Sequence, residues 1–280
     1  MTRPPLIVHQ LNATGVSPAE FIRIVASNGV DQVTLFTYDG GDLVPRTNTG
    51  LSYPTPVTAA NRQETLDALA ETGVTVDAVE FFPLTDAVDL ESYRAALAMG
   101  AAIGATRASS HIFITDDGRV IDKLGKLLDL AKSEGIGRIS SEFCPLTAGN
   151  NSVHRGKWLV DQLGRPEFGL NFDSLHIVRS GCTPAEIAAC DPKYFSISQI
   201  NDAIGTHVSS DYVPFSHKRE VPGQGDLPLV DIFNAIPESV AIEIETPAAH
   251  RRAAGVTAAE HVRDVIEGTR KIMARLTPTR

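Results

Sequence analysis

The stretch at residues 168–176, FGLNFDSLH, decides the fold. It begins as an apolar run typical of a buried strand, but it ends in an acid, Asp173, followed three residues later by His176. Burying an ionised carboxylate costs several kcal/mol unless the carboxylate is paired or bound to a metal ion. The stretch therefore predicts a buried strand whose last residue has a partner of opposite charge.

Seven other short runs rich in Val, Ile and Phe occur along the chain, with starts roughly 25 to 45 residues apart. This interval leaves room for a helix and two connections between successive parallel strands. The pattern is typical of βα units and a parallel sheet. The eight predicted strands are residues 6–11, 32–37, 76–82, 107–113, 138–143, 168–174, 195–201 and 240–245.

The segments between these strands carry helix signals. Ser17 is a predicted N-cap, Pro18 takes the first helical position, and Gly29 follows the end of that helix. Residues 120–135, 183–190 and 257–276 are predicted helices on similar grounds, the last two because each begins with Thr and has an acidic first turn.

Eight βα units with no composition shift between them predict an α/β protein, a single (β/α)8 TIM barrel that forms one domain over residues 1–280. Closure into a barrel leaves no exposed sheet edge. A doubly wound open sheet is the alternative. That fold would need a phosphate-binding turn after its first strand, and the sequence there, HQLNATG, contains no GxGxxG motif.

Composition and charge narrow the function. A formal net charge of -9 and a pI near 5.4 argue against nucleic acid as a partner, and no apolar stretch reaches the roughly 20 residues that span a bilayer. The first residues lack the long apolar core of a signal peptide, so we expect a cytoplasmic location. The three cysteines, Cys144, Cys182 and Cys190, form no CxxC pair and predict neither a disulfide framework nor a cysteine zinc site. A homo-oligomer is compatible with the sequence.

Polar residues recur at the carboxyl ends of the predicted strands, where a barrel of this type has its active site. They are His9, Glu80, His111, Glu142, Asp173, Gln199 and either Glu243 or Glu245. Acids that converge on one axis repel each other unless a cation lies between them, and carboxylate and amide oxygens suit Mg²⁺, Mn²⁺ or Co²⁺. The alternative is that each acid is an ordinary salt-bridge partner or helix cap, and that His176 caps the following helix or fills a gap in the core.

Two further features concern the same end of the barrel. Glu243 and Glu245 are two residues apart, so both point to the same face of an ideal strand, and periodicity does not choose between them. Arg219 lies in the loop KREVPGQGDLP, whose Pro and Gly residues predict a tight turn that could hold the guanidinium toward the barrel mouth. The alternative is an exposed surface arginine.

Taken in order, these motifs resemble the xylose-isomerase-like TIM-barrel superfamily, the sugar-phosphate isomerase/epimerase group. The resemblance covers nearly the whole chain. Its motifs are SSEF with Glu142, FDSLH with Asp173 and His176, QIND with Gln199, REVPGQGDLP with Arg219, and IEIE with Glu243.

The resemblance implies that one divalent cation binds to four residues, Glu142, Asp173, Gln199 and Glu243. Glu243 is chosen over Glu245 because the ligand in this family is the first acid of the final strand. The resemblance also implies that His176 and Arg219 contact substrate oxygens. From their strand-end positions we expect His9, Glu80 and His111 to contact the substrate as well.

Gln199 departs from the pattern of many epimerases of this group, which have His at that position. Gln there is more similar to the branch that contains the bacterial 3-dehydroshikimate dehydratases. An amide oxygen is a harder ligand than imidazole, so Zn²⁺ is less favoured than Mn²⁺, Mg²⁺ or Co²⁺.

The resulting hypothesis is a metal-dependent isomerase or epimerase of a small polyhydroxy ketone, a sugar or keto-cyclitol. A metal-bound carbonyl would stabilise the enediolate formed when a neighbouring C–H proton leaves, with Glu142 and Glu243 as bases and His176 assisting. One alternative is a lyase of the 3-dehydroshikimate dehydratase type. Another is a catalytically silent barrel that binds a sugar or serves as a subunit of a complex.

Overall fold

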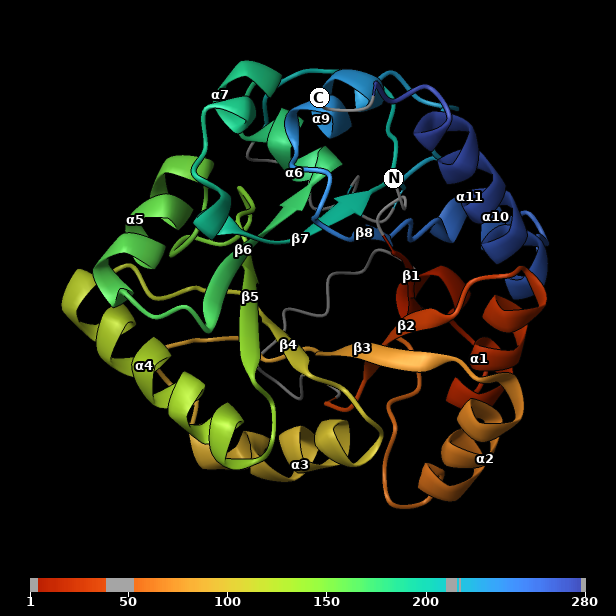
Figure 1. Ribbon diagram of the computed structural model, residues 1–280, viewed down its shortest axis with the longest axis horizontal. Coiled ribbons are helices and arrows are strands. Elements are labelled where there is room, and N and C mark those ends of the chain that lie inside the picture. Colours follow the sequence, from red (N-terminus) through yellow and green to blue (C-terminus); the bar gives the residue numbers. More distant parts are fainter. Residues whose placement is uncertain (1–4, 39–52, 210–215, 217, 278–280) are drawn as a thin grey trace.

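The computed structural model describes residues 5–38, 53–209, 216 and 218–277. Eight parallel strands close into a barrel in chain order, so that β8 pairs with β1 (Figure 1). The strands are β1 (Leu6–His9), β2 (Gln32–Phe36), β3 (Thr75–Glu80), β4 (Arg107–Ser110), β5 (Arg138–Glu142), β6 (Phe168–Asp173), β7 (Phe195–Ile200) and β8 (Ile242–Ile244). Seven of them lie within the predicted runs, β3 overlaps its run and begins one residue earlier, and the (β/α)8 architecture is confirmed.

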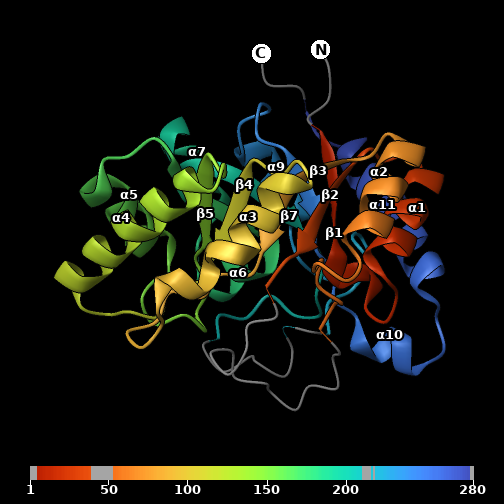
Figure 2. The same ribbon diagram turned by 90° about the horizontal axis from the view of Figure 1, so that it is seen from below.

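Helices surround the barrel in Figure 1, and Figure 2 shows the barrel from the side, with α10 at the lower edge. They are α1 (Pro18–Ser27), α2 (Arg62–Thr72), α3 (Arg94–Ala102), α4 (Asp117–Ser133), α5 (Val153–Leu163), α6 (Ser174–Arg179), α7 (Pro184–Ala188), α9 (Leu229–Ala235), α10 (Ala249–Ala253) and α11 (Ala258–Met273). Within the described ranges, none of them combines the length and apolar character needed to cross a lipid bilayer.

The helix boundaries follow from local chemistry. Ser17 caps α1 by accepting a hydrogen bond from the backbone N–H of Glu20, and Gly29 beyond its end has a φ of 67°, which favours glycine. At α11, Thr257 and Glu260 form a reciprocal capping box. The helix starts predicted at Pro18 and Ala258 are therefore confirmed.

Alternation along the strands separates an apolar layer from a polar interior. On β6, Leu170 and Phe172 belong to the apolar core, whereas Asn171 and Asp173 are buried polar residues. Successive side chains on a strand point to opposite faces, so the apolar pair faces the helices and the polar pair faces the barrel interior. The apparent contradiction in FGLNFDSLH, an apolar run with polar members, is thus the normal pattern of a barrel strand.

A charged network crosses the inside of the barrel. Arg107 on β4 contacts Asp77 Oδ2 on β3 at 2.6 Å and Ser140 Oγ on β5 at 2.7 Å. Its Nη2 also lies 3.8 Å from Glu243 Oε1 on β8, and Thr34 Oγ1 on β2 donates a hydrogen bond to the same oxygen. Groups from five strands meet here, which fixes the floor beneath the carboxyl ends of the strands.

Candidate active site

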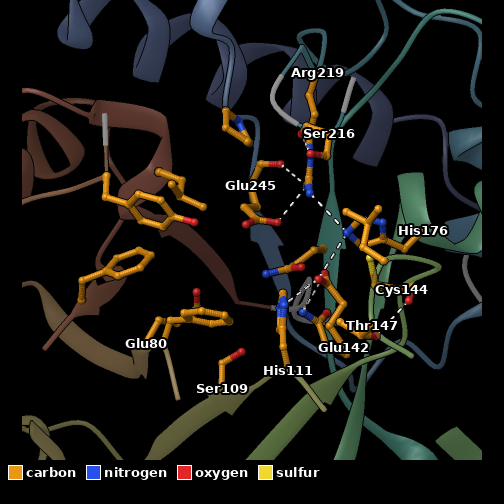
Figure 3. Close-up of a pocket in the computed structure, with 18 of the residues that line it drawn as sticks. Glu80, Ser109, His111, Glu142, Cys144, Thr147, His176, Ser216, Arg219 and Glu245 are labelled. Atoms are coloured by element: carbon orange, nitrogen blue, oxygen red, sulfur yellow. Dashed lines mark hydrogen bonds and ion pairs between the residues drawn. The ribbon is translucent and has the colours of Figure 1, made fainter. Parts of the chain in front are cut away.

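A pocket lies at the carboxyl ends of the strands, and every strand or the connection after it contributes to its lining. Figure 3 shows part of this lining. Its polar members are Glu80, Ser109, His111, Glu142, Cys144, Thr147, Asn171, His176, Gln199, Ser216, Arg219 and Glu245. The position agrees with the location of active sites in barrels of this architecture.

Three buried carboxylates come together at this pocket. Glu142, Asp173 and Glu245 each offer an oxygen, and these oxygens all lie within 4.8 Å of one another. Their exposed fractions are 3%, 0% and 7%, so water screens their mutual repulsion poorly. The group has the donor chemistry of a site for a hard divalent cation.

Glu243, the acid favoured by the family resemblance, lies elsewhere. Its Oε2 accepts a hydrogen bond from Gln199 Nε2 at 2.7 Å, and its Oε1 belongs to the network with Thr34 and Arg107. Among the described residues, the three-acid group contains Glu245 instead. Glu243 lies within β8, whereas Glu245 follows the last residue of that strand and is two residues nearer the barrel mouth. Metal binding by Glu243 stays a prediction, and its contacts favour a supporting position.

The side-chain amide of Gln199 bears on the question of a bound ligand, because only its nitrogen has a hydrogen-bond partner among the described residues. While its Nε2 is held by Glu243, its Oε1 is buried without a hydrogen-bond partner in the described part of the chain. A buried acceptor that lacks a partner costs free energy unless a ligand, water or ion satisfies it. Because Gln199 also lines the pocket, this oxygen fits the predicted role of cation ligand.

Asp173 already has partners within the protein. Arg219 Nη1 donates to its Oδ2 at 2.8 Å and Asn201 Nδ2 donates to the same atom at 2.6 Å. Its Oδ1 caps α6 by accepting from the backbone N–H of His176 at 3.0 Å. The ordinary interpretation, an ion pair and a helix cap, therefore describes part of its role. The case for a cation depends on the presence of Glu245 in the same group and on Gln199 Oε1.

Arg219 lies in the pocket lining. This is the position that the Pro and Gly residues of its loop predict. Its Nη1 contacts Asp173 Oδ2 and Glu245 Oε2, the latter at 2.7 Å, and its Nε donates to the carbonyl of Ser216 at 2.9 Å. The side chain is buried, at 4% exposure. One guanidinium thus bridges two of the three acids, and the third acid interacts with histidines.

That third acid, Glu142, lies between two imidazoles. His111 Nε2 is 3.1 Å and His176 Nε2 is 3.2 Å from its Oε2. Burial by itself would raise the pKa of Glu142, but the charges and hydrogen bonds of His176 and His111 outweigh burial and lower the pKa well below its ordinary value. Glu142 is therefore ionised at neutral pH, as a metal ligand must be.

Glu245 differs in its ionisation. Burial raises its pKa to about 7, although Arg219 and His9 oppose the shift. The nearby charges of Glu142 and Asp173 act in the same direction as burial. A carboxyl group with a pKa near neutrality can take up and release a proton under physiological conditions, which Glu142 cannot.

The two earliest predicted substrate contacts pair with each other. His9 Nε2 lies 2.9 Å from Glu80 Oε2. Glu80 lines the pocket, whereas His9 is fully buried and is not among the described lining residues. His111, also predicted to contact substrate, lines the pocket with a side chain 27% exposed. A direct substrate contact by His9 stays a prediction. Its buried position indicates instead that His9 holds the side chain of Glu80 in place.

Three polar residues at the site escaped the sequence interpretation. Asn171 donates from Nδ2 to Glu142 Oε1 at 3.5 Å and its Oδ1 has no hydrogen-bond partner within the described ranges. Asn201 contacts Asp173, and Cys144 forms a second group of candidate ligands with Glu142 and His176. Each of the three is two residues from a predicted ligand, Asn171 within β6 and the other two just beyond the ends of β5 and β7, and this spacing is the signal that could have revealed them.

The fold and the site together define a class: a (β/α)8 barrel with acids, amides and histidines gathered at the carboxyl ends of its strands. The family model for the xylose isomerase-like TIM barrel matches residues 22–272. The chain therefore belongs to the xylose isomerase-like TIM barrel family. No curated protein matches it by sequence.

Solved structures agree with the fold at low sequence identity. One similar structure is an IolI protein with a bound zinc atom, with a TM-score of 0.77 and 16% identity over 98% of this chain and 100% of that chain. A D-allulose 3-epimerase from Methylomonas sp. has a TM-score of 0.67 and 15% identity over 97% of this chain and 99% of that chain. A xylose isomerase-like barrel fused to 4-hydroxyphenylpyruvate dioxygenase gives 0.74 and 18% over 96% of this chain and 42% of the fusion protein. At these identities the likeness establishes the fold alone.

Proposed function

We propose that the chain is a divalent-metal-dependent isomerase or epimerase that acts on a small hydroxy ketone. The observation that carries the proposal is the meeting of Glu142, Asp173 and Glu245 in one buried group beside the unpartnered oxygen of Gln199. Membership of the family and the fold likeness to a D-allulose 3-epimerase support the same class of reaction.

In this proposal the cation ligands are Glu142, Asp173, Glu245 and Gln199. All four offer oxygen atoms, which favours Mn²⁺, Mg²⁺ or Co²⁺. Glu245 replaces Glu243 because Glu243 is engaged by Gln199, Thr34 and Arg107 beneath the pocket. The group of Glu142, Cys144 and His176 offers oxygen, sulfur and nitrogen instead, a donor set that suits Zn²⁺.

The residues around the group have chemistry suited to proton transfer next to a carbonyl. A bound cation would polarise the substrate carbonyl and stabilise negative charge that develops on its oxygen. Glu245 lines the pocket and belongs to the three-acid group, so its ionised carboxylate is the group that we assign to remove a C–H proton and return it. Arg219 and His176 face the same space and would hold substrate oxygens. This assignment differs from the sequence-based one, in which Glu142 and Glu243 are the bases.

Calorimetric titration of the purified, metal-free protein with Mn²⁺ tests the proposal. We expect one site per chain, lost in Glu142→Gln and Asp173→Asn. Asp202→Asn is the matched control, because Asp202 is a buried acid that accepts from backbone N–H groups of Gly223 and Leu227 outside the pocket lining. That variant should lose stability and keep Mn²⁺ binding.

A second measurement tests the chemistry. The Mn²⁺-loaded protein should exchange a substrate C–H next to a carbonyl for solvent deuterium, followed by NMR on a panel of ketoses and cyclic hydroxy ketones. New ultraviolet absorbance during the reaction would identify the lyase alternative, since loss of a β-hydroxyl creates an enone. A protein that binds no divalent cation near stoichiometry, or that binds ketones without any exchange, would contradict the proposed function.

A further inference from the structure

The pocket has two unlike walls. Residues from β5 to β8 supply most of its charged groups, as Figure 3 shows for Glu142, His176, Arg219 and Glu245. Residues from β1 to β4 and their connections supply an apolar wall, made of Leu11, Phe36, Tyr53, Phe81 and Phe113. The carbon skeleton of any ligand at the acids would extend against this second wall.

The rings of the apolar wall are fixed against their neighbours. Phe36 meets Tyr53 edge to face, with ring centroids 6.4 Å apart and an angle of 75° between planes. Phe81 meets the ring of His111 in the same manner at 4.7 Å. Tyr53 is 38% exposed and Phe113 is half-buried, and both line the pocket, so part of the surface of these two rings faces it.

The polar groups on the same wall have partners already. Glu80 pairs with His9 and accepts a hydrogen bond from Ser109, and His111 pairs with Glu142. A hydroxyl group placed against Leu11, Phe36, Phe81 or Phe113 would meet side chains of this wall that carry no hydrogen-bonding group. An unpaired buried polar group is costly, whereas an apolar group gains free energy by leaving water there.

We infer that the substrate is an α-hydroxy ketone that carries a planar apolar substituent. Its two oxygens meet the cation group of Glu142, Asp173 and Glu245, and its substituent packs against Phe36, Phe81 and the other rings of the apolar wall. This inference depends on the proposed function for the oxygen end and narrows its substrate class. A fully hydroxylated open-chain ketose fits this wall less well, because the side chains of Leu11, Phe36, Phe81 and Phe113 cannot form hydrogen bonds with its far hydroxyls.

A matched pair of ligands tests the inference. 2-Hydroxyacetophenone and hydroxyacetone share the same hydroxy ketone and differ by a phenyl in place of a methyl group. Calorimetric titration of Mn²⁺-loaded protein should give a dissociation constant at least tenfold lower for the phenyl compound, and D-fructose should bind no better than hydroxyacetone. Phe113→Ala and Tyr53→Ala should each reduce the phenyl preference to about threefold or less.

Trp158→Ala is the control for these variants. Trp158 is a partly buried ring on α5 with the Arg155 guanidinium 4.1 Å from its centroid, outside the pocket lining. Its removal should leave the phenyl preference unchanged. Phe113→Leu, which keeps an apolar side chain, should retain most of the preference and shows whether the Ala variant acts through the pocket surface rather than through misfolding.

The outcomes distinguish a failure of the substrate inference from a failure of the proposed function. Absence of stoichiometric Mn²⁺ binding in the first titration removes the proposed function. Normal Mn²⁺ binding with equal affinity for the two ketones, or with tighter binding of D-fructose, overturns the inference alone. A phenyl preference that survives both Phe113→Ala and Tyr53→Ala also overturns it, since the ring would then bind elsewhere.

Discussion

The polar residues at the strand ends have different surroundings in the two halves of the barrel mouth. In the half formed by β1–β4, Glu80 is matched by His9, and the rest of the wall is largely aromatic. In the half formed by β5–β8, Glu142, Asp173 and Glu245 crowd together with Arg219 as the guanidinium between two of them. Residues with the same place at a strand end thus serve structure on one side and present an anionic group on the other.

A strand-end acid can therefore be interpreted from the charged groups that surround it. A one-to-one pair such as His9 and Glu80 is satisfied by the protein. In the three-acid group, burial and the charges of Glu142 and Asp173 raise the pKa of Glu245, although Arg219 is in contact with it, and a bound cation would stabilise the ionised carboxylate. The balance of charges within contact distance, rather than the presence of an acid, distinguishes the two halves.

The largest expected effect concerns Glu243 in β8 and Glu245 directly after it. Glu245→Gln should weaken Mn²⁺ binding about a thousandfold, whereas Glu243→Gln should weaken it only about tenfold, the lower end of the 10- to 100-fold typical of a residue that supports a ligand. The reason is that Glu245 belongs to the three-acid group and Glu243 holds Gln199 from below. Titration calorimetry on both variants measures the difference. A reversed order would restore Glu243 as the ligand.

The second effect is confined to the apolar half. Phe36→Ala should lower the free energy of unfolding by about 3 kcal/mol, because Phe36 is 3% exposed and its removal leaves a cavity beside His9 and Tyr53. Urea denaturation measures the loss. Mn²⁺ affinity should stay within about twofold of the unsubstituted protein. If the folded variant no longer binds Mn²⁺, the two halves do not act separately.

A smaller effect is expected where the halves meet. His111 projects from the β4 side and contacts Glu142 on β5, so His111→Leu should weaken Mn²⁺ binding about tenfold through loss of support for Glu142. His250→Leu is the control, because His250 contacts Glu220 away from the pocket lining. Equal effects of the two substitutions would mean that the contact between His111 and Glu142 has no special role.

The smallest effect is on pH dependence. A metal ligand must be deprotonated, and Glu245 in the metal-free protein has a pKa of about 7. Protons therefore compete with the cation below pH 7, and Mn²⁺ affinity should fall about threefold from pH 7.5 to 6.5, since the ionised fraction falls by that factor. Glu245→Gln should abolish this dependence. A pH-independent affinity in the unsubstituted protein would contradict a ligand role for Glu245.

The barrel was predictable because it depends on local, repeated signals. The eight apolar runs, the spacing between them and caps such as Ser17 and Thr257 are properties of short segments, and the structure confirms them. The same signals predicted which strand ends carry polar side chains. Glu142 and Asp173 are brought together because barrel closure sends every strand end to one mouth.

The sequence did not predict how far each side chain lies from the barrel mouth, or which side chains are in contact across the barrel. Glu243 and Glu245 would share a face of an ideal strand, so only the register of β8 against its neighbours separates the acid in the floor from the acid at the mouth. The partners of Asp173 are equally invisible, because Asn201 and Arg219 are 28 and 46 residues away in the chain. The partner of opposite charge that FGLNFDSLH predicts for Asp173 is therefore in part Arg219 of the same chain.

The central claim is that one divalent cation binds among Glu142, Asp173 and Glu245. A crystal soaked in Mn²⁺ and measured at the manganese absorption edge tests it most directly. We expect a single strong anomalous peak bounded by oxygens of these three acids and by Gln199 Oε1, with Glu243 still bonded to Gln199. A peak held by Glu243, or no peak at the barrel mouth in crystals of protein loaded with Mn²⁺, would contradict it.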